Sequence, residues 1–280
     1  MLSVAAKAGE TAVGLAYSPA MAALARRRPG LTDYLEVPFE LLRHMPAVAE
    51  VQEEVPLLLH CASLSVGGFV APAPQLIDDI AAEAERMAVP WISEHLAFIS
   101  ADPLPGAESD EPAQLTYTVC PQLSEEVVDQ VARNVAALAP KLPAPLIVEN
   151  SPLYFEMPGS SMNMVQFVSR VVEATGIGLL LDLSHYLIAA SNTGFDAERE
   201  FERLPLENVV EVHLSGQSLQ SGIHWDDHAC PASERQFALL ERLLERSRPQ
   251  AITFEYNWNS AFPQALVEAH LERARAMAGR

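Results

Sequence analysis

The chain has 280 residues, of which 49% are hydrophobic and 20% charged, as in a globular protein with one sizeable core. No apolar run approaches the roughly 18 residues that a membrane-spanning helix needs, and the N-terminus lacks the features of a secretory signal, so we expect a cytoplasmic protein. The net charge of −19 would repel nucleic acid. Cys61, Cys120 and Cys230 are too few and too scattered for a disulfide framework, which favours a reducing compartment.

Eight short apolar segments follow one another along the chain, and we predict that they are β-strands. Most are near-continuous apolar runs, which is typical of parallel strands covered on both faces. Segments with helical spacing lie between several of them, and Ser124 and Ser233 are predicted N-caps. In chain order the predicted strands are 12–18, 33–38, 56–61, 90–95, 145–149, 177–183, 208–214 and 251–256, and the predicted helices are 75–87, 124–139, 161–174, 233–247 and 264–278.

Eight strands that alternate with helices predict an α/β protein, a (β/α)8 barrel of the TIM type that forms a single domain over residues 1–280. In such barrels the active site lies at the C-terminal ends of the strands. Residues 100–122 are rich in proline and acidic residues and show no periodicity. We therefore predict a long loop there that covers the mouth as a lid or as a partner surface.

Nine side chains that can bind metals lie at or just after the ends of six successive predicted strands. Because parallel strands bring their C-terminal ends to one rim, we expect these side chains to gather there. Five imidazoles and four carboxylates are too many for one ion, and four carboxylates leave three divalent cations with a net charge of +2. We predict two or three metals, with three fitting better. The nine residues are His60, His95, Glu149, Asp182, His185, His213, Asp226, His228 and Glu255.

Other polar residues near the strand ends are open to more than one interpretation. Glu36 and Glu40 end the second strand and could support the site or bind substrate, although Glu40 could equally cap a helix or lie on the surface. Cys61 and Cys230 lie beside proposed ligands and could act as catalytic nucleophiles, but a buried, unreactive cysteine is the more frequent case. Three further histidines fall outside the pattern, namely His224 near the cluster and His44 and His270 at expected surface positions.

Eight motifs carry these residues, in the order DYLEV, LLLHCASLSVGG, ISEHLAF, LIVENSP, LLLDLSHYLIAASNTGFD, VEVHLSG, DDHA and FEYN. Together they resemble the multinuclear non-haem iron-dependent oxidases, the family that includes the methanobactin-biosynthesis oxidase and the enzyme of thiaglutamate formation. The resemblance implies a barrel with two or three irons that uses O2 to modify a ribosomally synthesised precursor peptide, commonly at cysteine. It also implies a small companion protein that binds the peptide.

Carried over by position, the resemblance makes eight of the nine residues iron ligands. Asp182, His213 and Glu255 come from three different strand ends, and we expect each to be required for catalysis because it holds a metal. Two positions depart from the family, since many members have Asn in place of His185 and His in place of Gln217. The eight ligands are His60, His95, Glu149, Asp182, His213, Asp226, His228 and Glu255.

Three alternatives remain open. The ligand order also resembles endonuclease IV, a trinuclear zinc barrel that cleaves DNA at abasic sites, and histidine with carboxylate suits zinc as well as iron. Few basic residues lie near the strand ends, however, which disfavours DNA. Sugar isomerases share the barrel but use fewer histidine ligands than this chain offers. A barrel that no longer catalyses and only binds a partner would be expected to lose ligands, whereas none of the nine is lost here.

For the peptide and its companion protein, we predict docking at 100–122 and 151–162.

Overall fold

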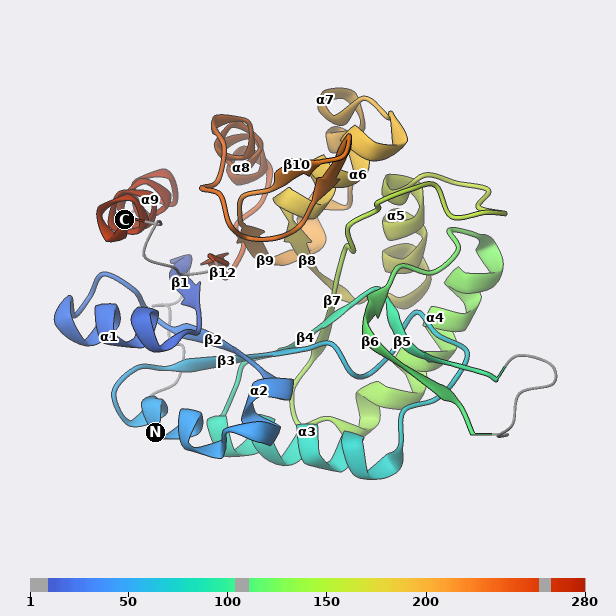
Figure 1. The fold of residues 1–280 in the computed structure, drawn as a ribbon, viewed down its shortest axis with the longest axis horizontal. Helices are drawn as coiled ribbons and strands as arrows, with labels where there is room; N and C mark the ends of the chain where they lie inside the picture. Colours follow the sequence, from blue (N-terminus) through green and yellow to red (C-terminus); the bar gives the residue numbers. More distant parts are fainter. Residues whose placement is uncertain (1–9, 104–110, 257–262, 280) are drawn as a thin grey trace.

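The computed structural model describes residues 10–103, 111–256 and 263–279, and its centre is a closed barrel of eight parallel strands (Figure 1). Every barrel strand lies within a predicted range, so the predicted α/β-barrel is confirmed. In their order around the barrel the strands are β1 (Ala12–Ala16), β2 (Leu35–Pro38), β3 (Leu57–Cys61), β4 (Ile92–His95), β7 (Leu146–Glu149), β8 (Gly178–Asp182), β9 (Val209–Leu214) and β12 (Ala251–Phe254), and β12 pairs with β1.

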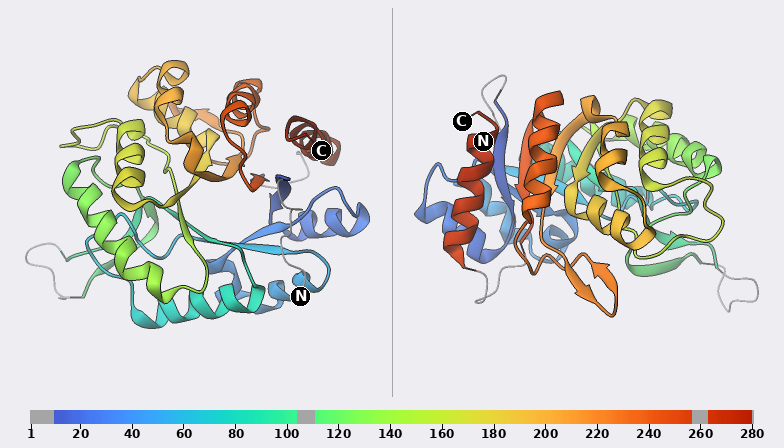
Figure 2. Two further views of the ribbon diagram at one scale, coloured as in Figure 1. Left: turned by 180° about the vertical axis from the view of Figure 1, so that it is seen from behind. Right: turned by 90° about the horizontal axis from the view of Figure 1, so that it is seen from above.

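Helices surround the barrel (Figures 1 and 2). The predicted capping residues are confirmed, since the Ser124 side chain accepts from Val127 N and Ser233 forms a capping box with Gln236. The α-helices are α1 (Pro19–Arg27), α2 (Phe39–His44), α3 (Pro74–Met87), α4 (Glu125–Leu138), α5 (Met164–Thr175), α6 (Leu183–Thr193), α7 (Ala197–Glu200), α8 (Glu234–Arg246) and α9 (Gln264–Met277). The 3-10 helices are η1 (Pro46–Glu53), η2 (Ala139–Lys141), η3 (Phe201–Arg203) and η4 (Leu206–Asn208). No described helix is both long enough and apolar enough to cross a membrane.

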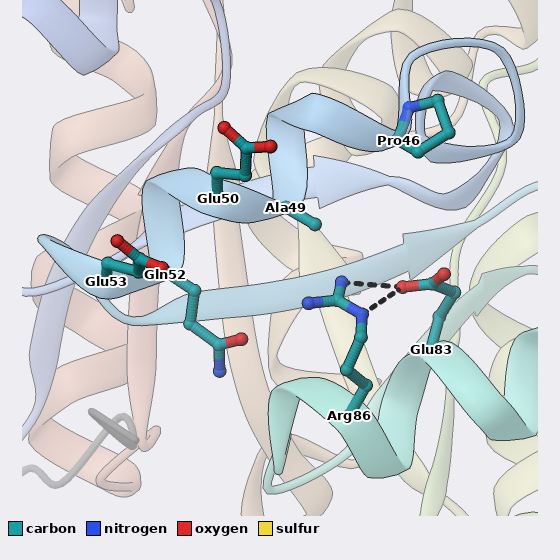
Figure 3. A pocket seen from close by; sticks show the side chains of 7 residues that line it. All are labelled: Pro46, Ala49, Glu50, Gln52, Glu53, Glu83 and Arg86. Carbon is teal, nitrogen blue, oxygen red and sulfur yellow. Dashed lines mark hydrogen bonds and ion pairs between the residues drawn. The ribbon is translucent and has the colours of Figure 1, made fainter.

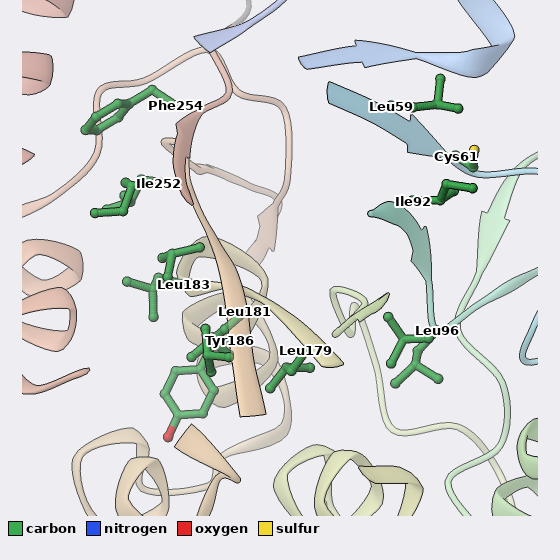
Figure 4. Close-up of a cluster of buried hydrophobic side chains, with 14 of the residues drawn as sticks. Leu59, Cys61, Ile92, Leu96, Leu179, Leu181, Leu183, Tyr186, Ile252 and Phe254 are labelled. Carbon is green, nitrogen blue, oxygen red and sulfur yellow. The ribbon is translucent and has the colours of Figure 1, made fainter. Parts of the chain in front are cut away.

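Alternate residues of several barrel strands belong to two different apolar layers. In β3, Leu58 and His60 point into the barrel, whereas Leu59 and Cys61 point outward, as successive strand residues must. Figure 4 shows part of the outer layer, including Leu59 and Cys61, and burial there raises the pKa of the Cys61 thiol. The inner layer closes the barrel below the rim and consists of Ala12, Tyr34, Leu58, Trp91, Ile147, Leu180 and Ala251.

Two antiparallel hairpins extend from the connections that follow β4 and β9. One pairs β5 (Phe98–Ala101) with β6 (Ala113–Val119), and the other pairs β10 (Ser218–Gln220) with β11 (Ile223–Trp225). Both project from the same end of the barrel (Figure 2, right). The prediction of an irregular loop over 100–122 was therefore wrong for β6, whose mostly exposed residues give no burial pattern. Residues 104–110 of that segment lie outside the described residues.

Candidate metal centre

The register of the barrel strands sets several of the nine side chains level with one another. His95 pairs with Glu149 across β4 and β7, and Asp182 pairs with His213 across β8 and β9. Glu149 and Asp182 stand two residues beyond members of the inner apolar layer, so both point into the barrel above it. The C-terminal rim of the barrel is thus the place where the predicted side chains converge.

The structure brings all nine side chains together in three groups, in each of which one ligand atom per residue lies within 4.8 Å of the others. The first two groups share Glu149, and a fourth such group joins Glu36 and Glu211 to His213. Such spacing suits atoms that bind one ion, because metal–nitrogen and metal–oxygen bonds are about 2 Å long. The residues could therefore hold three ions, and Glu149 would be shared by two of them. The groups are the first subsite (His60, His95, Glu149), the second subsite (Glu149, Asp182, His213, Glu255) and the third subsite (His185, Asp226, His228).

Glu149 lies at the centre of the three subsites. Its Oε2 atom is 3.5 Å from His60 Nε2 and 3.3 Å from His95 Nε2, while its Oε1 atom is 3.8 Å from His213 Nδ1. The Glu149 side chain is 1% exposed, and neither oxygen has a hydrogen-bond partner within the described part of the chain. Since buried polar atoms are nearly always paired, these oxygens are suited to binding a cation.

Backbone carbonyls fix the orientation of two of the imidazoles. His95 Nδ1 donates to the Cys61 carbonyl at 3.3 Å, and His185 Nδ1 donates to the Asn150 carbonyl at 2.9 Å. The Nε2 atom of each ring is left to face the cluster, and His185 Nε2 lies 3.0 Å from Asp226 Oδ2. A hydrogen bond to the second ring nitrogen is the usual way in which proteins orient a metal-binding histidine.

The start of helix α6 fixes Asp182 and His185 together. Asp182 is the N-cap, and its Oδ1 atom accepts from His185 N at 2.6 Å. The Asn150 side chain holds the Asp182 backbone from both sides, through its Nδ2 and Oδ1 atoms, each at 2.9 Å. The Oδ2 atom of Asp182 is buried and has no hydrogen-bond partner among the residues described, so the cap leaves it directed to the cluster. Asp182 and His185 are thus three residues apart because Asp182 caps the helix through the backbone N–H of His185.

The third subsite depends on the β10–β11 hairpin. His228 Nε2 and Asp226 Oδ1 are 3.0 Å apart, and His228 has a left-handed backbone with φ 53°. Asn192 of α6 anchors the hairpin, because its Nδ2 donates to the His224 carbonyl and its Oδ1 accepts from His224 N, both at 2.9 Å. A non-glycine residue with positive φ is uncommon, and such strain frequently marks a functional position.

The buried carboxylates of the site need positive charge nearby to balance them. Burial alone would lower the pKa of His185, but Asp182 and Asp226 raise it well above its ordinary value. Burial would raise the pKa of Glu149, yet His95 and His185 lower it to about 2. Burial raises the pKa of Asp182 to about 7. Buried carboxylates in this number need either protonated imidazoles or bound cations, and divalent transition metals match this donor set.

A cavity of about 820 Å³ opens onto the first and third subsites, where His95, His185 and Asp226 line it. Its other walls are mostly apolar, and the rings of Tyr154 and Trp225 stack there at a centroid distance of 4.5 Å. The lining contains no Lys or Arg among the described residues. Both segments that we predicted as docking surfaces contribute to it, through Tyr117–Cys120 and Ser151–Phe155.

A second cavity, of about 780 Å³, lies outside the barrel between η1 and α3 (Figure 3). None of the nine cluster residues lines it. Its single arginine, Arg86, already contacts Glu83 at 2.6 Å, and Glu50 and Glu53 lie on the facing helix. This cavity therefore contributes nothing to the candidate centre.

The remaining histidines and Glu40 lie apart from the three subsites. His224 belongs to β11, and His44 is exposed as expected. His270, which was expected at the surface, is half-buried on the inner side of α9, where its Nδ1 lies 2.6 Å from Tyr256 Oη and its ring contacts Phe237. Glu40 accepts from Ala62 N at 3.0 Å and so supports the turn after β3.

Sequence reasoning missed two residues that support the cluster, Ser93 and Asn150. Ser93 Oγ lies 2.8 Å from His60 Nδ1, and Asn150 holds both Asp182 and His185. The inward-facing positions of the strands, two residues apart, are the signal that could have found Ser93.

Comparisons with known proteins agree with the resemblance of the strand-end motifs. A model of the family described as "RiPP precursor modification enzyme MbnB/TglH/ChrH" matches residues 12–278. A UPF0276 protein of Caulobacter vibrioides is 30% identical over 256 residues, which are 89% of this chain and 88% of that protein. A UPF0276 protein of Streptomyces avermitilis is 29% identical over 261 residues, 91% of this chain, but the match covers 52% of that longer protein.

Solved structures with low sequence identity share the fold. The TTHB071 protein from Thermus thermophilus, soaked with ZnCl2, has a TM-score of 0.58 at 17% identity, with 96% of this chain and 98% of that chain covered. Endonuclease IV from the same organism has a TM-score of 0.54 at 18% identity, covering 96% and 99%. D-psicose 3-epimerase has a TM-score of 0.55 at 11% identity, covering 96% and 97%. At these identities the likeness shows the barrel alone.

Proposed function

The chain belongs to the RiPP precursor modification enzyme family MbnB/TglH/ChrH, whose substrates are ribosomally synthesised peptides, and from that premise we propose an iron-dependent oxidase. In this proposal the enzyme uses O2 to modify a precursor peptide at a cysteine residue. The three subsites hold three irons, with Glu149 shared between the first and the second. The sharing of Glu149 by the first and second subsites, with the third subsite beside them, carries the proposal.

When bound, the ions supply the redox chemistry that histidine and carboxylate side chains cannot supply. The protein residues bind the ions and keep the metal-binding side chains in orientation. The carbonyls of Cys61 and Asn150 hold the rings of His95 and His185, and the α6 cap holds Asp182. The apolar inner layer below the rim keeps water away from the lower side of the cluster, which strengthens every electrostatic contact there.

The cavity above the first and third subsites is the proposed binding place of the peptide. A cysteine side chain is short, so the flanking residues of the peptide must enter the cavity with it. The stacked pair of Tyr154 and Trp225 offers them a flat apolar wall. Binding energy from such flanking contacts would position the reacting residue, as in other enzymes that act on large substrates.

A small companion protein is the proposed partner that captures the precursor. The outer rim of the cavity is exposed and aromatic, with Tyr117 at 74% and Phe155 at 59% exposure. Exposed aromatic side chains next to a cleft suit a protein or peptide partner. The two residues lie within the β5–β6 hairpin and the segment after β7, the surfaces proposed for docking.

A zinc hydrolase of the endonuclease IV type is the second candidate, because its fold is shared and the donor set also suits zinc. A phosphodiester substrate, however, calls for cations around the cluster. The described cavity lining has no Lys or Arg, and the chain carries a net charge of −19. These two observations favour the peptide over DNA.

Protein purified without oxygen tests the proposal. We expect elemental analysis to find iron, and O2 consumption to accompany a mass change in a cysteine-containing precursor peptide encoded nearby, supplied together with any neighbouring small protein. Stoichiometric zinc, with no iron and no gain of activity on adding ferrous iron, would instead support the hydrolase.

A further inference from the structure

Glu36 of β2 lies inside the barrel, below the rim, between two histidines of different subsites. Its Oε2 atom is 3.0 Å from His213 Nε2, and its Oε1 atom is 3.9 Å from His60 Nδ1. The side chain is 2% exposed, and neither oxygen has a hydrogen-bond partner in the described ranges. A buried carboxylate without a partner is costly, so its position needs an explanation.

Glu211 of β9 is a second buried carboxylate near His213, but its partners are already complete. Glu211 Oε2 accepts from Trp91 Nε1 at 2.8 Å, and Oε1 accepts from Thr253 Oγ1 at 2.6 Å. It lies farther from His213 Nε2, at 3.6 Å. The two carboxylates therefore differ: Glu211 belongs to the hydrogen-bonded floor, whereas the nearest polar neighbours recorded for Glu36 are imidazoles of the cluster.

The orientation of His213 also differs from that of the other inner histidines. His60, His95 and His185 each place Nδ1 against a serine or a backbone carbonyl. His213 is reversed, since its Nδ1 atom faces the second subsite, 3.2 Å from Glu255 Oε2, and its Nε2 atom faces Glu36. An imidazole that binds a metal through Nδ1 needs an acceptor at Nε2 to hold its ring.

We propose that Glu36 is a positioning residue that orients His213 through Nε2 and, by its second oxygen, also supports His60. The inference rests on the proposed metal binding. Because the two histidines belong to the second and first subsites, one carboxylate supports two ions at once. The third subsite has no residue in contact with Glu36 in the described structure, so it should not depend on this carboxylate.

Glu36→Leu and Glu36→Gln test the proposal. Leucine removes the acceptor but fills a similar volume, and glutamine keeps an oxygen that can accept from Nε2. Metal-free protein is titrated with Co²⁺ alone under nitrogen, followed by visible absorption and checked by elemental analysis. For the leucine variant we expect roughly 10- to 100-fold weaker binding of two ions and unchanged binding of the third, with glutamine restoring most of the loss.

Thermal unfolding of the metal-free proteins separates positioning from a role in folding. Leucine should leave the metal-free protein folded, with a cooperative transition, because it fills a volume similar to that of the buried glutamate side chain. Glu40→Gln is the matched control, because Glu40 is a carboxylate four residues from Glu36 and glutamine keeps the oxygen that accepts from Ala62 N. This variant should bind all three ions as the wild type does.

Three results would overturn the inference: wild-type affinity for all ions in the leucine variant, equal weakening of all three, or a glutamine variant as weak as leucine. Wild-type protein that binds fewer than two Co²⁺ ions would remove the proposed function as well. Weak binding confined to the Glu36 variants leaves the proposed function standing and supports the positioning role.

Discussion

Replacing Glu149 by alanine should remove two ions and leave one. Among the described residues, Glu149 alone belongs to both the first and the second subsite. Without it the first subsite retains two histidines, and the second loses the one carboxylate that joins it to the first. The third subsite shares no described residue with the others and should stay filled. Elemental analysis of the loaded variant should therefore find one ion where the wild type binds three.

The thermal stability gained on metal loading gives a second measure of the same change. An ion supplied at 100 times its dissociation constant stabilises the folded state by about 2.7 kcal/mol, so three independent ions give about 8 kcal/mol and one gives about 2.7 kcal/mol. At roughly 2–4 °C per kcal/mol, loading should raise Tm by roughly 16–32 °C in the wild type and by roughly 5–11 °C in the variant.

Differential scanning fluorimetry with and without metal measures both shifts. Glu156→Ala is the matched control, because Glu156 is an exposed carboxylate in the segment after the same strand, and its variant should behave as the wild type. A Glu149→Ala protein that binds two or three ions, or keeps the full shift in Tm, would show that Glu149 is not a shared ligand.

Three further variants separate the parts of the site. His228→Ala should lose one ion and keep two, and elemental analysis that finds all three would remove His228 from the third subsite. Asp182→Asn and Asp182→Ala should both lose metal, but asparagine should keep the α6 cap. In urea unfolding of the metal-free proteins, the alanine variant should be less stable than the asparagine variant by about 1 kcal/mol, and equal stability would argue against the cap. Trp225→Ala should keep its metal but raise KM for the peptide roughly 10-fold, from a loss of about 1.4 kcal/mol of contact energy; an unchanged KM would place the peptide elsewhere.

The barrel could be predicted from the sequence because its strands are short apolar runs separated by helical patterns. Helix α6 was missed for a physical reason, since its residues from Leu183 to Ala190 are all buried and show no polar face to set a helical period. The β5–β6 hairpin was missed for a different reason: apolar and polar residues alternate along β6, but its apolar side is mostly exposed, so no buried apolar run marks the strand.

The gathering of the nine side chains was predictable because a parallel barrel brings its strand ends to one rim. Their division into subsites was not, since it depends on distances between strands that are far apart in the sequence. Glu36 illustrates the limit. Its place in the second predicted strand suggested that it supports the site or binds substrate, but only the structure shows that it lies between His60 and His213.

The β10–β11 hairpin joins two tasks, because Trp225 lines the cavity and the next residue, Asp226, belongs to the third subsite. Asn192 of α6 holds the hairpin at His224, so one anchor places both Trp225 and Asp226. Under the proposed function, occupancy of the third subsite and binding of the peptide are then thermodynamically linked. The factor by which the ion tightens the peptide must equal the factor by which the peptide tightens the ion.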